Sequence, residues 1–293
     1  VFPFSASAAD EEKPVDVKTT DDKTIVSELP TTDHSMLRQE GVPKGFQPLT
    51  VAGQEIDAAY LEETLGDNHG VIVFLHDQGE QFDNRVIGPL RQAFPDYGWS
   101  TLTLAFDYPY KAKIYLATDE VKEQEDEKAV ETEKVAAEKT QTATEDKIEE
   151  KQTLPPVANI ARMEAALEFV KNKEFERIIF VGHGAGGNLA IELLDKLTTE
   201  VSALVIIGTS QLDSDQVFET LKFPILDIIG SNDHDDVKPA AMHRKKLMKQ
   251  AGNNYYDLRE VTGADHVFYG LQPQLNITLR SWLNKYFVEN ITE

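Results

Sequence analysis

The sequence predicts an α/β fold in which helices cover both faces of a mostly parallel central sheet. Three observations support it: short apolar runs recur along the chain, segments of helical periodicity lie between them, and a glycine-rich turn joins one run to a helix. The apolar runs are residues 71–75, 101–106, 177–181, 203–207, 225–229 and 256–261. Strands that are buried on both faces have such continuous apolar runs, because helices cover a parallel sheet on either side.

Apolar residues between and after these runs repeat every three or four positions, as they do on one face of a helix. Three helices are expected, with apolar faces formed by Ile160, Met163, Leu167 and Val170, by Leu189, Leu193 and Leu197, and by Trp282, Leu283, Tyr286 and Phe287. Residues 46–51 and 56–61 flank Ala52-Gly53 and alternate in polarity. They predict an N-terminal hairpin of half-buried edge strands.

The composition favours one large domain and disfavours several kinds of partner. The chain has 293 residues, 41% of them hydrophobic, which is enough for one full-sized core over residues 41–293. Its net charge of -22 repels phosphate backbones, so no nucleic-acid partner is expected. The absence of cysteine excludes disulfides, thiolate metal sites and a cysteine nucleophile. No apolar run approaches the roughly 18 residues of a membrane span.

Two N-terminal segments differ from this domain. Residues 1–8 start with apolar residues and end in Ala6-Ser7-Ala8, the small-residue pattern of a signal-peptidase site. We expect them to be the remnant of a signal peptide, and the protein to be periplasmic or otherwise exported. Residues 9–40 are polar and acidic without an apolar period, which predicts a flexible tail.

A charged insertion is expected at residues 118–152. The stretch from Asp119 to Glu150 holds thirteen acidic residues and only isolated valines and one isoleucine. Good helix formers and acid–lysine pairs favour a helix, but no face is apolar enough to dock on a core. We expect a projecting helical or disordered segment. The alternative is an arm that binds an unknown protein partner.

The most informative motif follows the run at residues 177–181. It reads Gly182-His183-Gly184-Ala185-Gly186 and leads into a helical pattern. A nucleophile elbow has this strand, tight turn and helix, and its G-x-S-x-G motif holds a serine on the sharp turn. Gly184 stands at the serine position, so the motif lacks its nucleophile. The plainer interpretation is that glycine relieves the strained backbone of the turn.

Through this motif and the order of its loops, the chain from Gly41 to Phe287 resembles the α/β-hydrolase superfamily. Within it, residues 90–104, LRQAFPDYGWSTLTL, are similar to a bacterial family of exported hydrolase-like proteins of unknown function, whose members tend to carry glycine at the elbow. The resemblance implies the α/β-hydrolase fold and a lineage. It implies no particular activity.

The resemblance also implies positions for a catalytic acid and a catalytic histidine. Asp233 ends the stretch Gly230-Ser231-Asn232-Asp233, which is similar to the loop of the triad acid, and Asp235 and Asp236 are register alternatives. His266 ends Gly263-Ala264-Asp265-His266, which resembles the loop of the triad histidine. Isolated Asp and His residues in loops are more often structural. Their coincidence with two expected loops favours a retained pair.

An oxyanion hole is implied by the same resemblance. Related hydrolases form it from two backbone amides, one after the elbow and one in the loop that follows an early core strand. Here these are the amide of Ala185 and the backbone of Asp77 and Gln78, although Asp77 stands where glycine is usual. No cofactor is expected. No metal site is expected either, because adjacent acids in one loop, as at residues 233–236, are weak evidence for one.

Two functions fit these patterns. A catalytically degenerate hydrolase that serves as a binding or assembly module in the cell envelope is the first, because glycine has no side chain to attack a carbonyl. The second is a weak or unconventional esterase that uses His266 with water or with a replacement nucleophile. Ser210, Ser231 and Asp107 are the candidates for that nucleophile, because each is expected at a strand end.

Overall fold

The computed structural model describes residues 42–83, 85–108, 156–211 and 217–289. The segments expected to be a signal-peptide remnant (1–8), an acidic tail (9–40) and a charged insertion (118–152) lie outside the described residues. All of the elements below belong to the unit that starts at Pro43.

A seven-stranded sheet forms the centre of the fold, in the order β3-β5-β4-β6-β7-β8-β9. Every neighbouring pair is parallel except β3 with β5, which is antiparallel. The strands are β3 (Ala58–Leu61), β4 (Gly70–Leu75), β5 (Trp99–Leu104), β6 (Ile178–His183), β7 (Ala203–Ile207), β8 (Ile225–Gly230) and β9 (Tyr256–Val261). The mostly parallel sheet expected from the apolar runs is confirmed.

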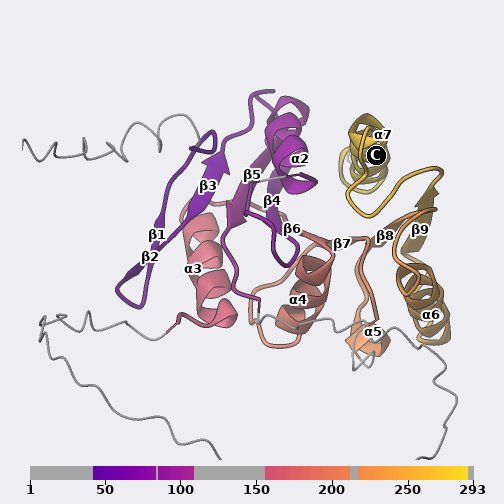
Figure 1. Cartoon of the computed structure of the whole chain (residues 1–293). Helices are drawn as coiled ribbons and strands as arrows, with labels where there is room; N and C mark the ends of the chain where they lie inside the picture. The colour runs from indigo at the N-terminus through magenta and orange to yellow at the C-terminus, as the bar shows by residue number, and fades with distance from the viewer. Residues whose placement is uncertain (1–41, 84, 109–155, 212–216, 290–293) are drawn as a thin grey trace, which may run out of the picture. The chain divides into compact units, whose positions relative to one another are not determined.

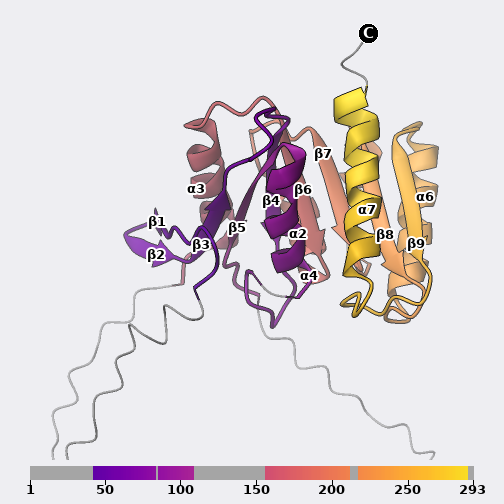
Figure 2. The same cartoon turned by 90° about the horizontal axis from the view of Figure 1, so that it is seen from above.

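Helices cover both faces of this sheet. Figures 1 and 2 show α2 and α7 on one face and α3, α4 and α6 on the other. The helices are α2 (Ile87–Ala93), α3 (Asn159–Lys171), α4 (Ala185–Leu194), α5 (Val217–Thr220), α6 (Val237–Gln250) and α7 (Gln272–Leu283), with a short 3-10 helix η1 (Phe94–Tyr97) and a short π-helix η2 (Asn284–Val288). Side chains of β4 alternate between the two cores: Val71 and Val73 pack on one face, Ile72 and Phe74 on the other.

The N-terminal hairpin differs from its prediction. Strands β1 (Leu49–Val51) and β2 (Gln54–Ile56) pair with each other in a separate two-stranded sheet. The second expected strand, residues 56–61, is divided at Asp57, and only its later part, β3, joins the central sheet. The carbonyl of Asp57 accepts a hydrogen bond from the amide of Ala105 at this point, which ties the division to the end of β5.

Helix α4 packs on the sheet through the expected leucines together with small residues. Its buried residues are Gly186, Gly187, Ala190, Ile191 and Leu193. Leu189 and Leu197 are partly buried and pack against the same core, although Leu197 lies beyond the end of the helix. The two glycines let the first turn of α4 approach the strands closely, and this approach sets which face is buried.

Candidate active site

Gly184 forms the turn between β6 and α4. Its backbone has φ 52° and ψ -118°, a conformation that L side chains rarely adopt. Its amide donates a hydrogen bond to the carbonyl of Ile207 in the neighbouring strand β7, at 2.9 Å. The turn therefore has the sharp geometry of a nucleophile elbow.

The glycines on either side of Gly184 allow the strand and the helix to approach. A Cβ on Gly182 would lie 2.5 Å from the carbonyl oxygen of Gly186. A Cβ on Gly186 would overlap the carbonyl oxygen of Leu75. Side chains at these two positions would force α4 away from the sheet, so the elbow needs both glycines.

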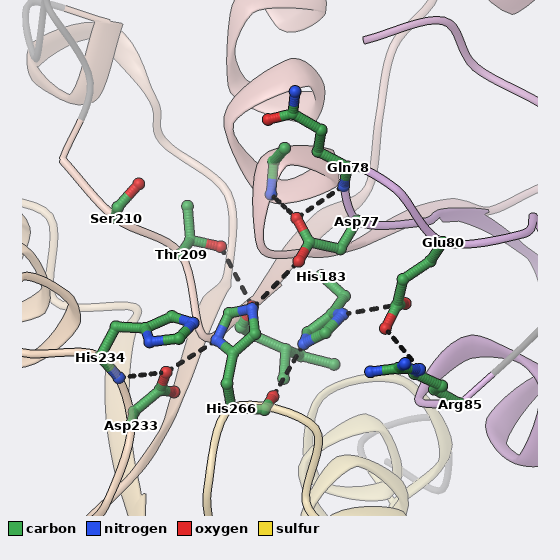
Figure 3. A network of polar contacts seen from close by, with 12 residues as sticks. Asp77, Gln78, Glu80, Arg85, His183, Thr209, Ser210, Asp233, His234 and His266 are labelled. Carbon is green, nitrogen blue, oxygen red and sulfur yellow. Dashed lines mark hydrogen bonds and ion pairs between the residues drawn. The ribbon is translucent and has the colours of Figure 1, made fainter. Parts of the chain in front are cut away.

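The space that a side chain on Gly184 would occupy is filled by Asp77. A Cβ on Gly184 would lie closer than 3.0 Å to all three atoms of the Asp77 carboxyl group. Asp77 comes from the loop after β4, and Figure 3 shows its carboxylate pointing toward the His266 ring. The Asp77 side chain therefore takes up the space in which a serine on the elbow would lie.

The two amides expected to form the oxyanion hole both bind this carboxylate. The amide of Ala185 donates to Asp77 Oδ1 at 2.6 Å, and the amide of Gln78 donates to the same oxygen at 2.8 Å. Asp77 was expected to contribute through its backbone amide. In the structure its side chain accepts the hydrogen bonds of the other two expected amides.

His266 lies between two carboxylates, in the loop after β9. Its Nδ1 is 2.7 Å from Asp233 Oδ1, and its Nε2 is 3.1 Å from Asp77 Oδ2 (Figure 3). Burial lowers the pKa of the imidazole, but its hydrogen bonds to Asp233 and Asp77 raise that pKa to about 9. At neutral pH the ring is therefore a cation.

The same contacts act on the two carboxyl groups. Burial raises the pKa of Asp77, but the hydrogen bonds from His266 and Ala185 outweigh it and hold that pKa at about 2. Burial also raises the pKa of Asp233, while the bonds from His266 and the His234 amide bring it below its ordinary value. Both carboxylates are ionised, so one cation is held between two anions.

A second histidine, His183, contacts the backbone and the ring of His266. His183, the last residue of β6, is fully buried, and its Nε2 donates to the carbonyl of His266 at 2.9 Å. Its Nδ1 lies 3.6 Å from Glu80 Oε2, and neither of these buried atoms has a hydrogen-bond partner. The rings of His183 and His266 are 4.7 Å apart at an interplanar angle of 33°. His183 thus fixes the backbone on which His266 is held.

Comparison with known proteins identifies the family of this chain. The family model described as "Protein of unknown function (DUF3530)" matches residues 1–285. The chain belongs to this family. A search of curated proteins finds no significant match to the sequence.

Solved structures resemble this family member in fold. A serine hydrolase without a lid from Xanthomonas campestris has a TM-score of 0.58 at 13% identity, with 84% of this chain and 96% of that chain covered. Est1E from Butyrivibrio proteoclasticus has a TM-score of 0.58 at 11% identity, with 83% and 98% covered. A protein of unknown function from Agrobacterium tumefaciens gives 0.58 at 15%, with 82% and 95% covered. These likenesses confirm the α/β-hydrolase fold.

The other expected residues lie elsewhere or bind other groups. Asp235 and Asp236 are exposed, so of the three acids only Asp233 contacts His266 among the described residues. Ser231 Oγ accepts from the amide of Gly263, and Asp107 exchanges two backbone hydrogen bonds with the Asn159 side chain. Ser210 accepts from Asn188, and Figure 3 shows its hydroxyl pointing away from His266. None of the three candidate replacement nucleophiles has a described hydrogen bond to His266.

Among the described residues, two groups of side chains are close enough together to hold a metal ion. They are Asp77, His183 and His266, and Asp233, His234 and His266. His266 belongs to both, and its two ring nitrogens already bind Asp233 and Asp77. An ion would have to replace one of these contacts, so we assign neither group as a metal site.

Proposed function

We propose that this protein is a catalytically degenerate member of the α/β-hydrolase fold that serves as a binding or assembly module of the bacterial cell envelope. The observation that supports this best is the Asp77 carboxylate, which fills both the nucleophile space at Gly184 and the oxyanion hole. A substrate carbonyl cannot enter while this carboxylate is in place.

The protonation of His266 supports the same conclusion. A general base has to accept a proton from serine or water, and a ring that carries both of its protons cannot do so. Its pKa of about 9 keeps His266 protonated throughout the physiological range. The water-based esterase is opposed by this protonation and by the filled oxyanion hole. A carboxylate with three donors around it is also a poor nucleophile.

An enzyme assay with a reconstructed elbow tests the loss of activity. Wild-type protein should show no hydrolysis of p-nitrophenyl acetate above background. Asp77→Gly/Gly184→Ser, which empties the elbow and supplies a serine, should gain turnover, because His266 and Asp233 are already paired. Adding His266→Ala to this double variant should abolish the gain. Wild-type turnover that disappears in His266→Ala would contradict the proposal and favour the unconventional esterase.

The location and the partner rest on sequence alone. Export is proposed from the signal-peptidase pattern at residues 6–8, and a protein partner is proposed for the acidic segment 118–152. None of the described helices is long and apolar enough to cross a membrane. Fractionation of the native bacterium, followed by N-terminal sequencing of the mature chain, tests the first. Protein starting at Ala9 in the periplasmic fraction is the expected result.

A further inference from the structure

The Asp77 side chain is held as a ligand would be held. One carboxylate oxygen accepts from two backbone amides, and the other faces the His266 ring at 3.1 Å. The amide of Ala185 also opens helix α4, so the positive end of that helix faces the same oxygen. Two amides and an imidazole arranged around two oxygens form a cradle whose geometry matches a carboxylate.

Two donors of this cradle, the Ala185 amide and the His266 ring, are held in place by residues other than Asp77. The turn that presents Ala185 is fixed by the bond from the Gly184 amide to Ile207. The His266 ring is fixed by Asp233 at 2.7 Å and by the bond from His183 to the His266 carbonyl. Withdrawal of the Asp77 side chain would therefore leave these donors in place. An empty, preorganised set of donors favours binding of the same chemical group.

The cradle is partly exposed to solvent. The side chains of Asp77 and His266 remain 19% and 16% exposed. Gln78 and Gly79, the next residues of this loop, are exposed, and a Cβ on Gly79 would contact nothing within 4 Å. A ligand that replaced the Asp77 carboxylate could extend past these exposed residues.

We propose that the cradle formed by Ala185, Gln78 and His266 is a binding site for a carboxylate ligand, and that Asp77 is a tethered occupant that competes with it. This rests on the proposed binding function and names the ligand class. An intramolecular competitor acts at an effective concentration on the order of millimolar or above, so an external carboxylate must displace it. The ligand is a small organic acid or the carboxyl end of a peptide.

Calorimetric titration with acetate tests the site directly. Asp77→Ala removes the occupant, and acetate should then bind at least tenfold more tightly than to the wild type. Acetamide, which has the same shape without the charge, should bind at least tenfold more weakly than acetate. Asp77→Ala/His266→Gln should lose most of the acetate affinity. Asp67→Ala, which removes a carboxylate before β4 instead of after it, should behave as the wild type.

Peptide titrations distinguish the two sources of the carboxylate. Tri-alanine that binds Asp77→Ala more tightly than acetate, with loss of binding when its C-terminus is amidated, supports a peptide end. Equal or weaker binding than acetate supports a small acid. If Asp77→Ala does not fold, Asp77→Ser replaces it, because its short side chain also vacates the cradle.

Three results would overturn this proposal: a folded variant that does not bind acetate, equal binding of acetate and acetamide, or wild-type protein that binds acetate as tightly as the variant. Each can occur while the wild type still lacks esterase activity. The carboxylate site and the degenerate function can therefore fail separately.

Discussion

The carboxyl group of Asp77 and the missing side chain of Gly184 occupy the same space. A Cβ on residue 184 would lie closer than 3.0 Å to three atoms of Asp77. The two departures from a serine hydrolase, glycine at the elbow and aspartate in the loop after β4, are therefore one structural change. Asp77 can hold its side chain in this place only because residue 184 is a glycine.

The first prediction concerns Gly184→Ser. Alone, it should lower the free energy of unfolding by about 2–4 kcal/mol, because the side chain meets Asp77 and the backbone conformation is strained for any L residue. Asp77→Gly/Gly184→Ser should recover the part of this loss that comes from the overlap. Urea denaturation of the three proteins measures the difference. A double variant that is no more stable than Gly184→Ser would show that the overlap is not the cause.

The second prediction is a fall in stability with rising pH. The folded-state pKa of His266, about 9, is above its ordinary 6.5, so its contribution is complete below pH 6.5 and is lost as pH rises through 9. The pKa of Asp77 is lowered from 3.8 to about 2, so its contribution is present above pH 3.8 and is lost as pH falls through 2.

Both contributions are complete between about pH 4 and 6.5. Between pH 6.5 and 9 the free energy of unfolding should fall by at most about 1.4 kcal/mol per pH unit from this group, the slope for one proton. The free energy of unfolding of Asp77→Asn should fall less steeply with pH, because one of the two contacts that raise the His266 pKa is lost. Urea denaturation at several pH values measures both slopes. Equal slopes would contradict the ion pair.

The third prediction concerns Glu80. Since the His266 carbonyl can only accept, His183 Nε2 carries a hydrogen, and Nδ1 faces Glu80 Oε2 without a hydrogen bond. Glu80→Gln offers an amide donor to Nδ1 and should be tolerated. Glu80→Ala offers no donor and leaves Nδ1 unpaired, as it is beside Glu80, so this variant should be less stable than Glu80→Gln by about 1–3 kcal/mol.

The control for Glu80 is Arg85→Ala, because Arg85 lies 3.7 Å from Glu80 Oε1 and is largely exposed. It removes the surface charge without touching His183, and should change stability by less than about 0.5 kcal/mol. Thermal unfolding of the three variants compares them. Equal losses in Glu80→Gln and Glu80→Ala would mean that Nδ1 needs no donor.

The fourth prediction concerns the buried ion pair of Arg244 and Asp227. Arg244 Nε donates to Asp227 Oδ2 at 2.9 Å, and its other nitrogens bind the carbonyls of Thr209 and Ser210. Arg244→Met should cost about 3–5 kcal/mol, because it leaves Asp227 charged and buried. Adding Asp227→Leu should restore part of this. Lys249→Met, on the exposed side of the same helix, is the control. A loss within about 0.5 kcal/mol for Arg244→Met would contradict the pairing.

The apolar pattern was sufficient to locate several strands. Residues 203–207 and 256–261 were expected as strands, and these are the bounds of β7, which is fully buried, and of β9, a partly exposed edge strand. Strand β5 begins two residues earlier than the run at 101–106, because Trp99 and Ser100 pair with Gly70 and Val71 of β4. Helix α6 was not expected at all. A buried arginine and two alanines form much of its inner face, so it has little apolar period.

The sequence also indicated that Asp233 and His266 occupy the acid and histidine loops of the fold, and the structure places them in contact. Their catalytic roles stay a prediction. The sequence indicated the contact of Asp77 with the elbow less clearly. Asp77 was noticed as a departure from glycine in its loop, but the direction of its side chain could not be read from the sequence.

The sequence by itself determined the sheet and the glycine-containing turn between strand and helix, because these depend on local patterns of apolar and small residues. Only the tertiary structure decided what fills the elbow. Asp77 is 108 residues from Ala185 and 189 from His266. Asp77 meets Ala185 because β4 lies next to β6, and the loop after β9, at the same carboxyl edge of the sheet, brings His266 to Asp77. Whether the space beside Gly184 is empty or filled depends on the Asp77 side chain, which comes from the loop after β4.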